Sequence, residues 1–122
     1  MIDWRRKREE RAKRHRRVRR KVFGLPERPR LTVFKSARHM YAQIVNDLEG
    51  HTIAAASTLS AEFRSRFAKG AKTDAAKVVG EILAEKAQQA QIRRVVFDRG
   101  GYPFHGRIRA LASGAREKGL EF

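Results

Sequence analysis

The segment RLTVFKSARHMYAQIVNDLEGHTIAAAS, residues 30–57, decides the fold of this chain. It holds three runs of β-branched, aromatic or small apolar residues, at 30–35, 40–45 and 52–57. In the second run Met40, Ala42 and Ile44 alternate with the residues between them, which is the period of a strand with one buried face. Two short polar turns separate the runs. They therefore predict an antiparallel three-stranded meander.

A long helix and a fourth strand are expected after the meander. Residues 59–71 are interpreted as a short helix or an irregular loop. Thr73 is the expected N-cap of a helix over 74–91, because Asp74 and a periodic apolar run follow it. The predicted buried face of that helix consists of Ala75, Val78, Val79, Ile82, Leu83, Lys86, Ala87 and Ala90. Residues 94–98 have the continuous apolar centre that is typical of a buried parallel strand.

A last helix is predicted over residues 106–118. Its apolar stripe consists of Ile108, Leu111, Ala112 and Ala115, and Gly119 stands where a left-handed cap belongs. The order βββαβα predicts an α/β (α+β) fold with one mixed four-stranded sheet and a right-handed crossover. Two prolines and a glycine within residues 24–29 mark a linker. The expected organisation is an arm at 1–23, this linker, and a domain at 30–122.

The arm is dominated by positive charge. Twelve of the seventeen residues at 5–21 are Lys or Arg, and with two Glu the segment carries +10 of the net +16 of the chain. Since like charges repel, we expect the segment to be loose in free solution and helical against phosphates. Only Ala12 and Val18 are apolar, so no stripe for docking on protein is predicted. The alternative is a solvated charge run without a fixed partner.

Composition narrows the possible functions. The isoelectric point of about 11.4 favours a nucleic-acid partner. The chain has no Cys, which excludes disulfides and thiolate metal sites, and no apolar run approaches the roughly 20 residues of a membrane span. We expect no secretory signal, because no apolar stretch follows the basic N-terminus. The four His are scattered, so neither a metal site nor a cofactor is expected.

Two stretches raise the question of catalysis. Residues 101–108, GYPFHGRI, have the glycine spacing of a nucleotide phosphate loop, but Arg107 and Ile108 replace its Lys and its Ser or Thr. An NTPase is therefore rejected. A metal-dependent nuclease needs several converging carboxylates. Asp98 at a strand end is the one suggestive acid, and we interpret it as a salt-bridge or loop hydrogen-bond partner.

The loop before the last helix still suits nucleic acid. Free backbone amides at a helix N-terminus attract phosphate, and Arg and His residues surround this one. The rings of Tyr102 and Phe104 either stack on unpaired bases or plug the end of the sheet, and the sequence leaves both open. The first turn, around Arg38 and His39, is a second basic tip and is either a nucleic-acid contact or a solubilising turn.

These residues carry a resemblance to a known family. Residues 97–107 (FDRGGYPFHGR), 110–112, 115–117 and 119–122 resemble the C-terminal signature of large-ribosomal-subunit protein eighteen of bacteria. Residues 28–31, 33–36 and 41–43 resemble its first hairpin, and 54–57 its third strand. The chain departs from the pattern at Pro103, at Phe104 and in the 62–72 region.

The resemblance implies a cytoplasmic scaffold of the large ribosomal subunit rather than an enzyme. Its expected partners are 5S rRNA, 23S rRNA and neighbouring ribosomal proteins of the 5S particle in the central protuberance, with no membrane. A ribonuclease-H-like topology without that enzyme's carboxylates is implied. The expected rRNA-binding residues are Arg5, Arg6, Lys7, Arg8, Arg11, Lys13, Arg14, Arg16, Arg17, Arg19, Arg20, Lys21, Arg30, Lys35, Ser36, Arg38, His39, Tyr41, Arg99, Tyr102, Phe104, His105, Arg107 and Arg109.

Three other functions fit the sequence less well. A duplex DNA binder would need a recognition helix, but both long helices of the domain place a face in the core. A nuclease of ribonuclease H type would need the missing carboxylates, and a membrane-surface binder would need a more apolar side on the arm.

Overall fold

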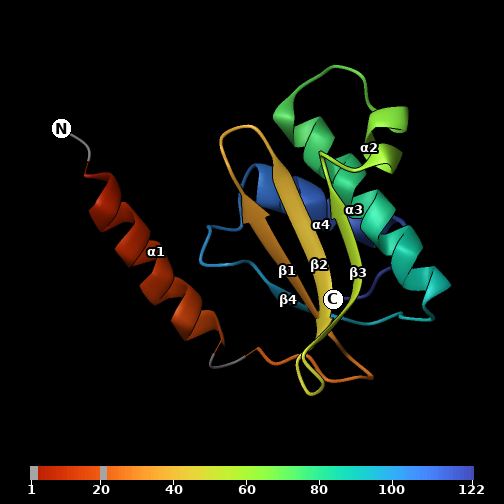
Figure 1. Cartoon of the computed structure of the whole chain (residues 1–122), viewed down its shortest axis with the longest axis horizontal. Helices are drawn as coiled ribbons and strands as arrows, with labels where there is room; N and C mark the ends of the chain where they lie inside the picture. The colour runs from red at the N-terminus through yellow and green to blue at the C-terminus, as the bar shows by residue number, and fades with distance from the viewer. Residues whose placement is uncertain (1–2, 20–21) are drawn as a thin grey trace.

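A computed structural model of the chain describes residues 3–19 and 22–122 (Figure 1). The elements, in chain order, are α1 (Trp4–Arg19), β1 (Arg30–Lys35), β2 (Met40–Asn46), β3 (His51–Ser57), α2 (Ala61–Arg66), α3 (Lys72–Gln89), β4 (Val96–Asp98) and α4 (Arg107–Glu117). The predicted order of strands and helices in the domain, βββαβα, is confirmed, with α2 inserted after β3. The arm is helical, as predicted. The undecided segment after β3 contains the short helix α2.

One mixed sheet organises the domain, as predicted. Its strand order is β3-β2-β1-β4, with antiparallel pairs between β1, β2 and β3 and a parallel pair between β1 and β4. Leu31 lies opposite Ile44 and Phe97, so the buried faces of three strands coincide. The β4 strand has three residues rather than the five expected and lies at the edge of the sheet. Arg94 instead pairs with Glu121 beyond the end of the strand.

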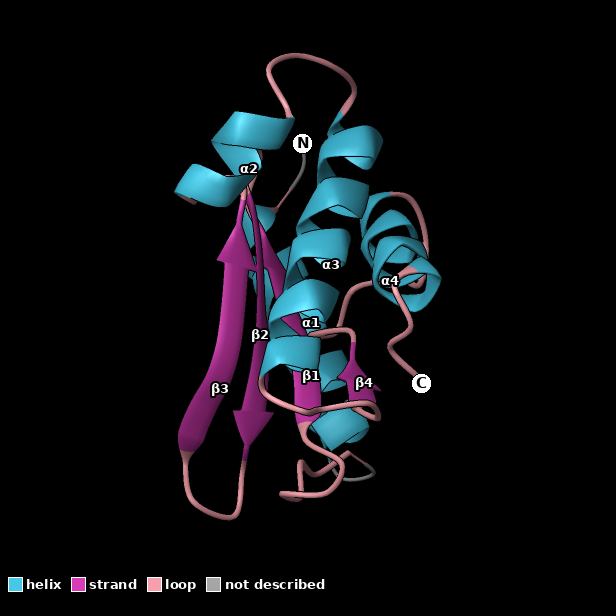
Figure 2. Ribbon diagram, turned by 90° about the vertical axis from the view of Figure 1, so that its right-hand side faces the viewer, coloured by secondary structure: helices cyan, strands magenta, loops and turns pink. Residues whose placement is uncertain are grey.

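Helices α3 and α4 cover one face of the sheet (Figure 2). The core lies between the sheet and these helices. The inward-pointing side chains of the strands form one side of it, and the apolar faces of the helices form the other. Fully buried side chains at this interface include Leu31, Met40, Ile44, Val79, Ile82, Leu83, Ile108 and Leu111. Because α3 and α4 lie on the same side, the strand residues that point the other way form an open face. The arm and the functional site are built on that face.

Glycines allow α3 and α4 to approach each other closely. A Cβ added to Gly80 would lie 2.1 Å from the carbonyl oxygen of Leu111, and one added to Gly114 would lie 2.2 Å from that of Lys77. The structure buries Val79, Ile82, Leu83 and Ala87 of the predicted stripe, and it also buries three small residues that the stripe omitted, Ala76, Gly80 and Ala84. Ala90, expected on the buried face, is exposed beyond the last turn.

The N-terminus of α3 differs from the sequence prediction, whereas the C-terminus of α4 matches it. The N-cap of α3 is Ala71 and not Thr73, and no side chain caps this end. The C-terminus of α4 is as expected. Gly119 has a φ of +100°, its amide donates to the Arg116 carbonyl, and the Leu120 amide donates to the Ala115 carbonyl. This is the hydrogen-bond pair of a Schellman motif.

The segment at 24–29 is a packed turn. Its bends are fixed by reciprocal backbone hydrogen bonds between Leu25 and Arg28. The Gly24 amide donates to Asp47 Oδ2 at 2.8 Å, and a Cβ on Gly24 would lie 2.5 Å from the Val45 carbonyl oxygen. The packed part of the domain therefore extends back to Gly24, ahead of Pro29, where we expected it to begin.

Candidate nucleic-acid interface

Helix α1 presents its basic side chains to solvent. No residue of Trp4–Arg19 is fully buried. Asp3 Oδ1 accepts the Arg6 amide at 3.1 Å, as an N-cap does, and Glu10 pairs with Arg6 at i, i+4 over 3.2 Å. Such exposed contacts contribute only a few tenths of a kcal/mol each. They leave most of the positive charge on the helix without an intramolecular partner acid.

One face of α1 docks on the domain through polar groups. Arg11 Nη1 donates to the Tyr102 hydroxyl, Arg14 Nε donates to the Gly101 carbonyl, and His15 Nε2 lies against Asp98 Oδ2, each at 3.0 Å. Positions 11, 14 and 15 share a helical face. The expectation that no face of the arm would dock on protein was wrong, because that reasoning considered only apolar stripes.

Gly101 is the point of closest approach between arm and domain. Its φ is +78°, and a Cβ placed there would lie 2.5 Å from the Arg11 carbonyl oxygen and 3.0 Å from the His15 amide nitrogen. Both of these atoms belong to the backbone of α1, so neither moves without moving the helix. The absence of a side chain at this position is what allows α1 to lie against the loop.

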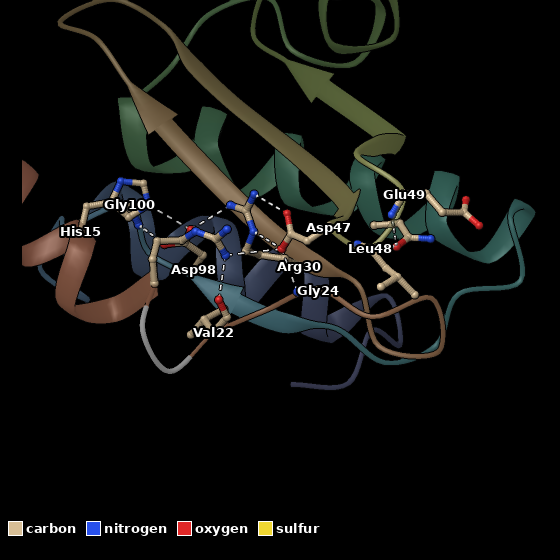
Figure 3. Close-up of polar contacts among 11 residues, drawn as sticks. His15, Val22, Gly24, Arg30, Asp47, Leu48, Glu49, Asp98 and Gly100 are labelled. Carbon is tan, nitrogen blue, oxygen red and sulfur yellow. Dashed lines mark hydrogen bonds and ion pairs between the residues drawn. The ribbon is translucent and has the colours of Figure 1, made fainter.

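A network of buried carboxylates anchors the docked helix (Figure 3). Asp98 is fully buried. Its Oδ2 accepts Arg30 Nη1 at 2.9 Å beside His15, and its Oδ1 accepts the Gly100 amide at 2.9 Å. This confirms the interpretation of Asp98 as a salt-bridge and hydrogen-bond partner.

Asp47 completes the network at the far end of β2. Arg30 donates to it through Nε at 2.8 Å and Nη2 at 3.0 Å, a bidentate contact. These bonds, with help from the Gly24 amide and against the effect of burial, lower the pKa of Asp47 from 3.8 to about 2. The same bonds raise the pKa of Arg30. Arg19 adds a longer contact to Asp47 Oδ2, at 3.4 Å, and so ties the end of α1 to the same carboxylate.

Side chains from α3 and α4 hold the tip of the β1–β2 hairpin through hydrogen bonds to its backbone. Arg107 donates to the carbonyl oxygens of Ser36 and His39 at 2.9 Å each, and Lys72 Nζ donates to the Ala37 carbonyl at 2.7 Å. The start of α4 and the start of α3 therefore brace one turn. Arg38, between these contacts, remains exposed. The hairpin tip is a fixed basic projection rather than a loose turn.

Tyr102 joins the hairpin, the arm and the C-terminal loop. It is 6% exposed, and its hydroxyl donates to the Lys35 carbonyl and accepts the Lys35 amide, each at 3.3 Å. Arg11 and Lys35 lie over its ring at 4.9 and 5.3 Å from the centroid. Burial and repulsion from Arg107 and Arg11 lower the pKa of Lys35. Of the two roles considered for Tyr102, the structure supports the plug.

Comparison with known proteins identifies the family. The family model described as ribosomal L18 of archaea, bacteria, mitochondria and chloroplast matches residues 5–122. The chain belongs to the L18 family of ribosomal proteins. The protein named large ribosomal subunit protein uL18 of Thermotoga petrophila is 57% identical over the whole length of both chains. Namesakes from Thermomicrobium roseum and Caldicellulosiruptor saccharolyticus are 58% and 54% identical, over 92% and 93% of this chain and 91% and 92% of theirs.

Membership of this family makes the chain a structural protein of the large ribosomal subunit, which is cytoplasmic in bacteria, and not an enzyme. Within residues 3–19 and 22–122, no three His, Asp or Glu side chains gather as a metal site. In the same residues no helix is long and apolar enough to cross a membrane.

The expected rRNA-binding residues fall into three groups in this L18-family structure. The first group is exposed and consists of Arg5, Arg6, Lys7, Arg8, Lys13, Arg14, Arg16, Arg17, Ser36, Arg38, Arg99, Phe104, His105 and Arg109. The second is partly buried and consists of Arg11, Arg19, Arg30, Lys35, His39, Tyr41 and Arg107, while Tyr102 is buried. Arg20 and Lys21 lie outside the described residues. Most of the charged side chains that are buried in part are occupied with holding the arm or the hairpin.

The structure does not bring every member of the C-terminal loop together. Tyr102 points toward β1 and the arm. Phe104 instead packs edge-to-face on Phe97 at 5.9 Å, with Arg116 at 5.9 Å from its ring. Its ring is 42% exposed beside a hollow of about 470 Å³ on the outer side of α4. Phe104 therefore belongs to a second surface, separate from the hairpin tip.

Sequence reasoning missed the residues that position the arm. It assigned no docking role to His15, Asp47 or Gly101. It predicted an ion pair for Asp98 without its partners, Arg30 and His15. A signal was present in the sequence, since Arg11, His15 and Val18 recur at helical spacing and are the partly buried side of α1. Asp47 and Asp98 gave a second indication, because a carboxylate that becomes buried on folding needs a cationic partner.

Proposed function

We propose that this chain binds 5S rRNA and helps attach it to 23S rRNA in the central protuberance, beside neighbouring large-subunit proteins. The observation that carries the proposal is the docked arm. An exposed helix with Arg or Lys at most positions is fixed against the domain so that its cations continue onto Lys35 and the braced hairpin tip. Phosphate groups of a folded RNA are the partner that such a surface suits.

The two parts of this surface have different tasks in the proposal. The outer face of α1, with Arg8, Lys13, Arg16 and Arg17, supplies phosphate contacts that neutralise charge without reading sequence. The hairpin tip at Arg38 supplies the fit to one RNA, together with the exposed ring of Phe104 on the separate surface beside α4. A braced turn and a packed ring keep one shape, and a fixed shape is needed to discriminate between folded RNAs.

Salt dependence tests the phosphate contacts. The double variant Arg16→Gln, Arg17→Gln should bind 5S rRNA more weakly, with the log–log salt slope reduced by roughly 0.7–0.9 per lost contact. The matched control is Arg64→Gln, Arg93→Gln, which removes the same charge from exposed positions of the domain. Equal slopes for the two doubles would show that α1 has no special share in binding.

Competition tests the identity of the RNA. The intact chain should prefer 5S rRNA to an unrelated structured RNA of similar length across a range of salt concentrations. Phe104→Ala should lower that preference by about 1–3 kcal/mol, the cost of a lost base stack, and leave the salt slope unchanged. Equal affinity of the intact chain for both RNAs would overturn the proposal of 5S rRNA as the specific partner.

A further inference from the structure

The open face of the sheet carries an aromatic pair that the fold does not require to be exposed. Phe34 on β1 lies directly opposite Tyr41 on β2, and their ring centroids are 5.9 Å apart with the planes tilted by 42°. Phe34 is 51% exposed. A cross-strand aromatic pair stabilises a sheet by roughly 0.2–1 kcal/mol, which accounts for the contact between the rings. It does not account for leaving their outer faces in solvent.

The surroundings of the pair form a row across the sheet. On one side the Arg11 guanidinium of α1 lies 6.0 Å from the Phe34 centroid. On the other side Tyr41 borders a shallow hollow of about 190 Å³, which is floored by alanines of β2 and β3 and rimmed by Gln43, Ser57 and Ser60. The row therefore runs from a cation through two aromatic rings to a small, flat hollow with hydrogen-bonding groups at its rim.

The charge around this row favours nucleic acid over a protein side chain. Arg11 lies over the Phe34 ring, and Arg38 is exposed in the turn that follows β1. The carboxylates Asp47 and Asp98 lie at the opposite end of β1, where Arg30 neutralises them. An apolar protein segment would gain nothing from these cations, whereas a nucleotide brings a phosphate to them together with a π-face for the rings.

We propose that Phe34 and Tyr41 form a stacking platform for an unpaired base of the bound RNA. The base lies on the exposed ring faces over the hollow, and its phosphate lies toward Arg11. Gln43 carries both a donor and an acceptor at the rim and is placed to meet the edge of the base. This inference rests on the proposed function, since it names what one part of the RNA-binding surface contacts.

Binding of 5S rRNA to the full-length variant Phe34→Leu tests the platform. Leucine keeps an apolar side chain at a half-exposed position but removes the π-face. Affinity should fall about tenfold, within the range that a lost stack produces, while the log–log salt slope stays unchanged. The matched control is Phe23→Leu, at a phenylalanine of nearly equal exposure (52%) that precedes the packed turn at 24–29 and is not part of the aromatic pair. It should leave the affinity unchanged.

Ultraviolet crosslinking gives a second, independent measurement. Irradiation of the wild-type complex with 5S rRNA should join a nucleotide to the peptide that carries Phe34 or to the peptide that carries Tyr41. If 5S rRNA binds but Phe34→Leu loses no affinity and neither peptide crosslinks, the platform is refuted while the proposed function stands. If Phe34→Leu affects only incorporation alongside other ribosomal proteins, the face is a protein contact and the platform is equally refuted. Absence of 5S rRNA binding by the wild type would instead refute the proposed function.

Discussion

Gly101→Ala should release the basic arm from the domain without unfolding either part. The added Cβ would lie 2.5 Å from the Arg11 carbonyl oxygen, and ordinary contact begins near 3.4 Å. Relief therefore requires α1 to move by about 1 Å, which lengthens contacts now at 3.0 Å toward 4 Å, outside the range of a hydrogen bond. The three side-chain contacts that dock the helix would be lost together.

The free energy at stake follows from those three contacts. A net contribution of about 1 kcal/mol for each gives about 3 kcal/mol in total, or roughly a hundredfold change in the ratio of docked to undocked arm. Alanine at positive φ adds about 1–2 kcal/mol of backbone strain, which acts on the loop itself. Gly50→Ala is the matched control, because Gly50 has a φ of +64° and no atom lies within 4 Å of its added Cβ.

Distances between two spin labels measure the docking directly. The chain has no Cys, so labels on Ala12→Cys in the arm and Ser113→Cys on α4 are the only ones introduced, and both positions are exposed. The distance distribution should be narrow in the doubly labelled parent and in the Gly50→Ala background, and broad in the Gly101→Ala background. An equally narrow distribution in Gly101→Ala would refute the reasoning that close backbone approach holds the arm.

Three further outcomes are expected. Because Arg30 lowers the pKa of Asp47 to about 2, the ion pair stabilises the fold fully above pH 4. The free energy of unfolding should fall by about 2 kcal/mol as the pH falls from 4 through 2. Asp47→Asn should remove this part of the acid dependence of urea unfolding. Gly80→Ala should lower the free energy of chemical unfolding by about 1–3 kcal/mol, because the added Cβ would meet the Leu111 carbonyl. Alanine in a helix is otherwise favoured over glycine by about 1 kcal/mol. A more stable variant would therefore contradict the close packing of α3 on α4. Purified protein with Mg²⁺ should not cleave RNA, and cleavage that Asp98→Asn abolishes would contradict the assignment of that carboxylate to the network.

The open sheet face and the hairpin tip illustrate a mixed outcome for sequence reasoning. Alternation within residues 40–45 predicted that Met40, Ala42 and Ile44 share one face of the second strand, and the structure buries that face and leaves Tyr41 on the other. It did not indicate that Arg107 and Lys72 brace the turn between β1 and β2. Those contacts use backbone carbonyls as acceptors, and every residue has one, so composition carries no sign of them.

Apolar periodicity and charge density act over a few residues along the chain, so they specify the elements, the mixed sheet and the basic character of the arm. The position of the arm follows from long-range contacts alone. These contacts join residues far apart, such as Arg11 with Tyr102 and His15 with Asp98, and depend on a glycine that lets two backbones meet. Helical spacing marks Arg11 and His15 as one face of the arm, but it does not name their partners, because only the folded chain brings the opposite groups beside them.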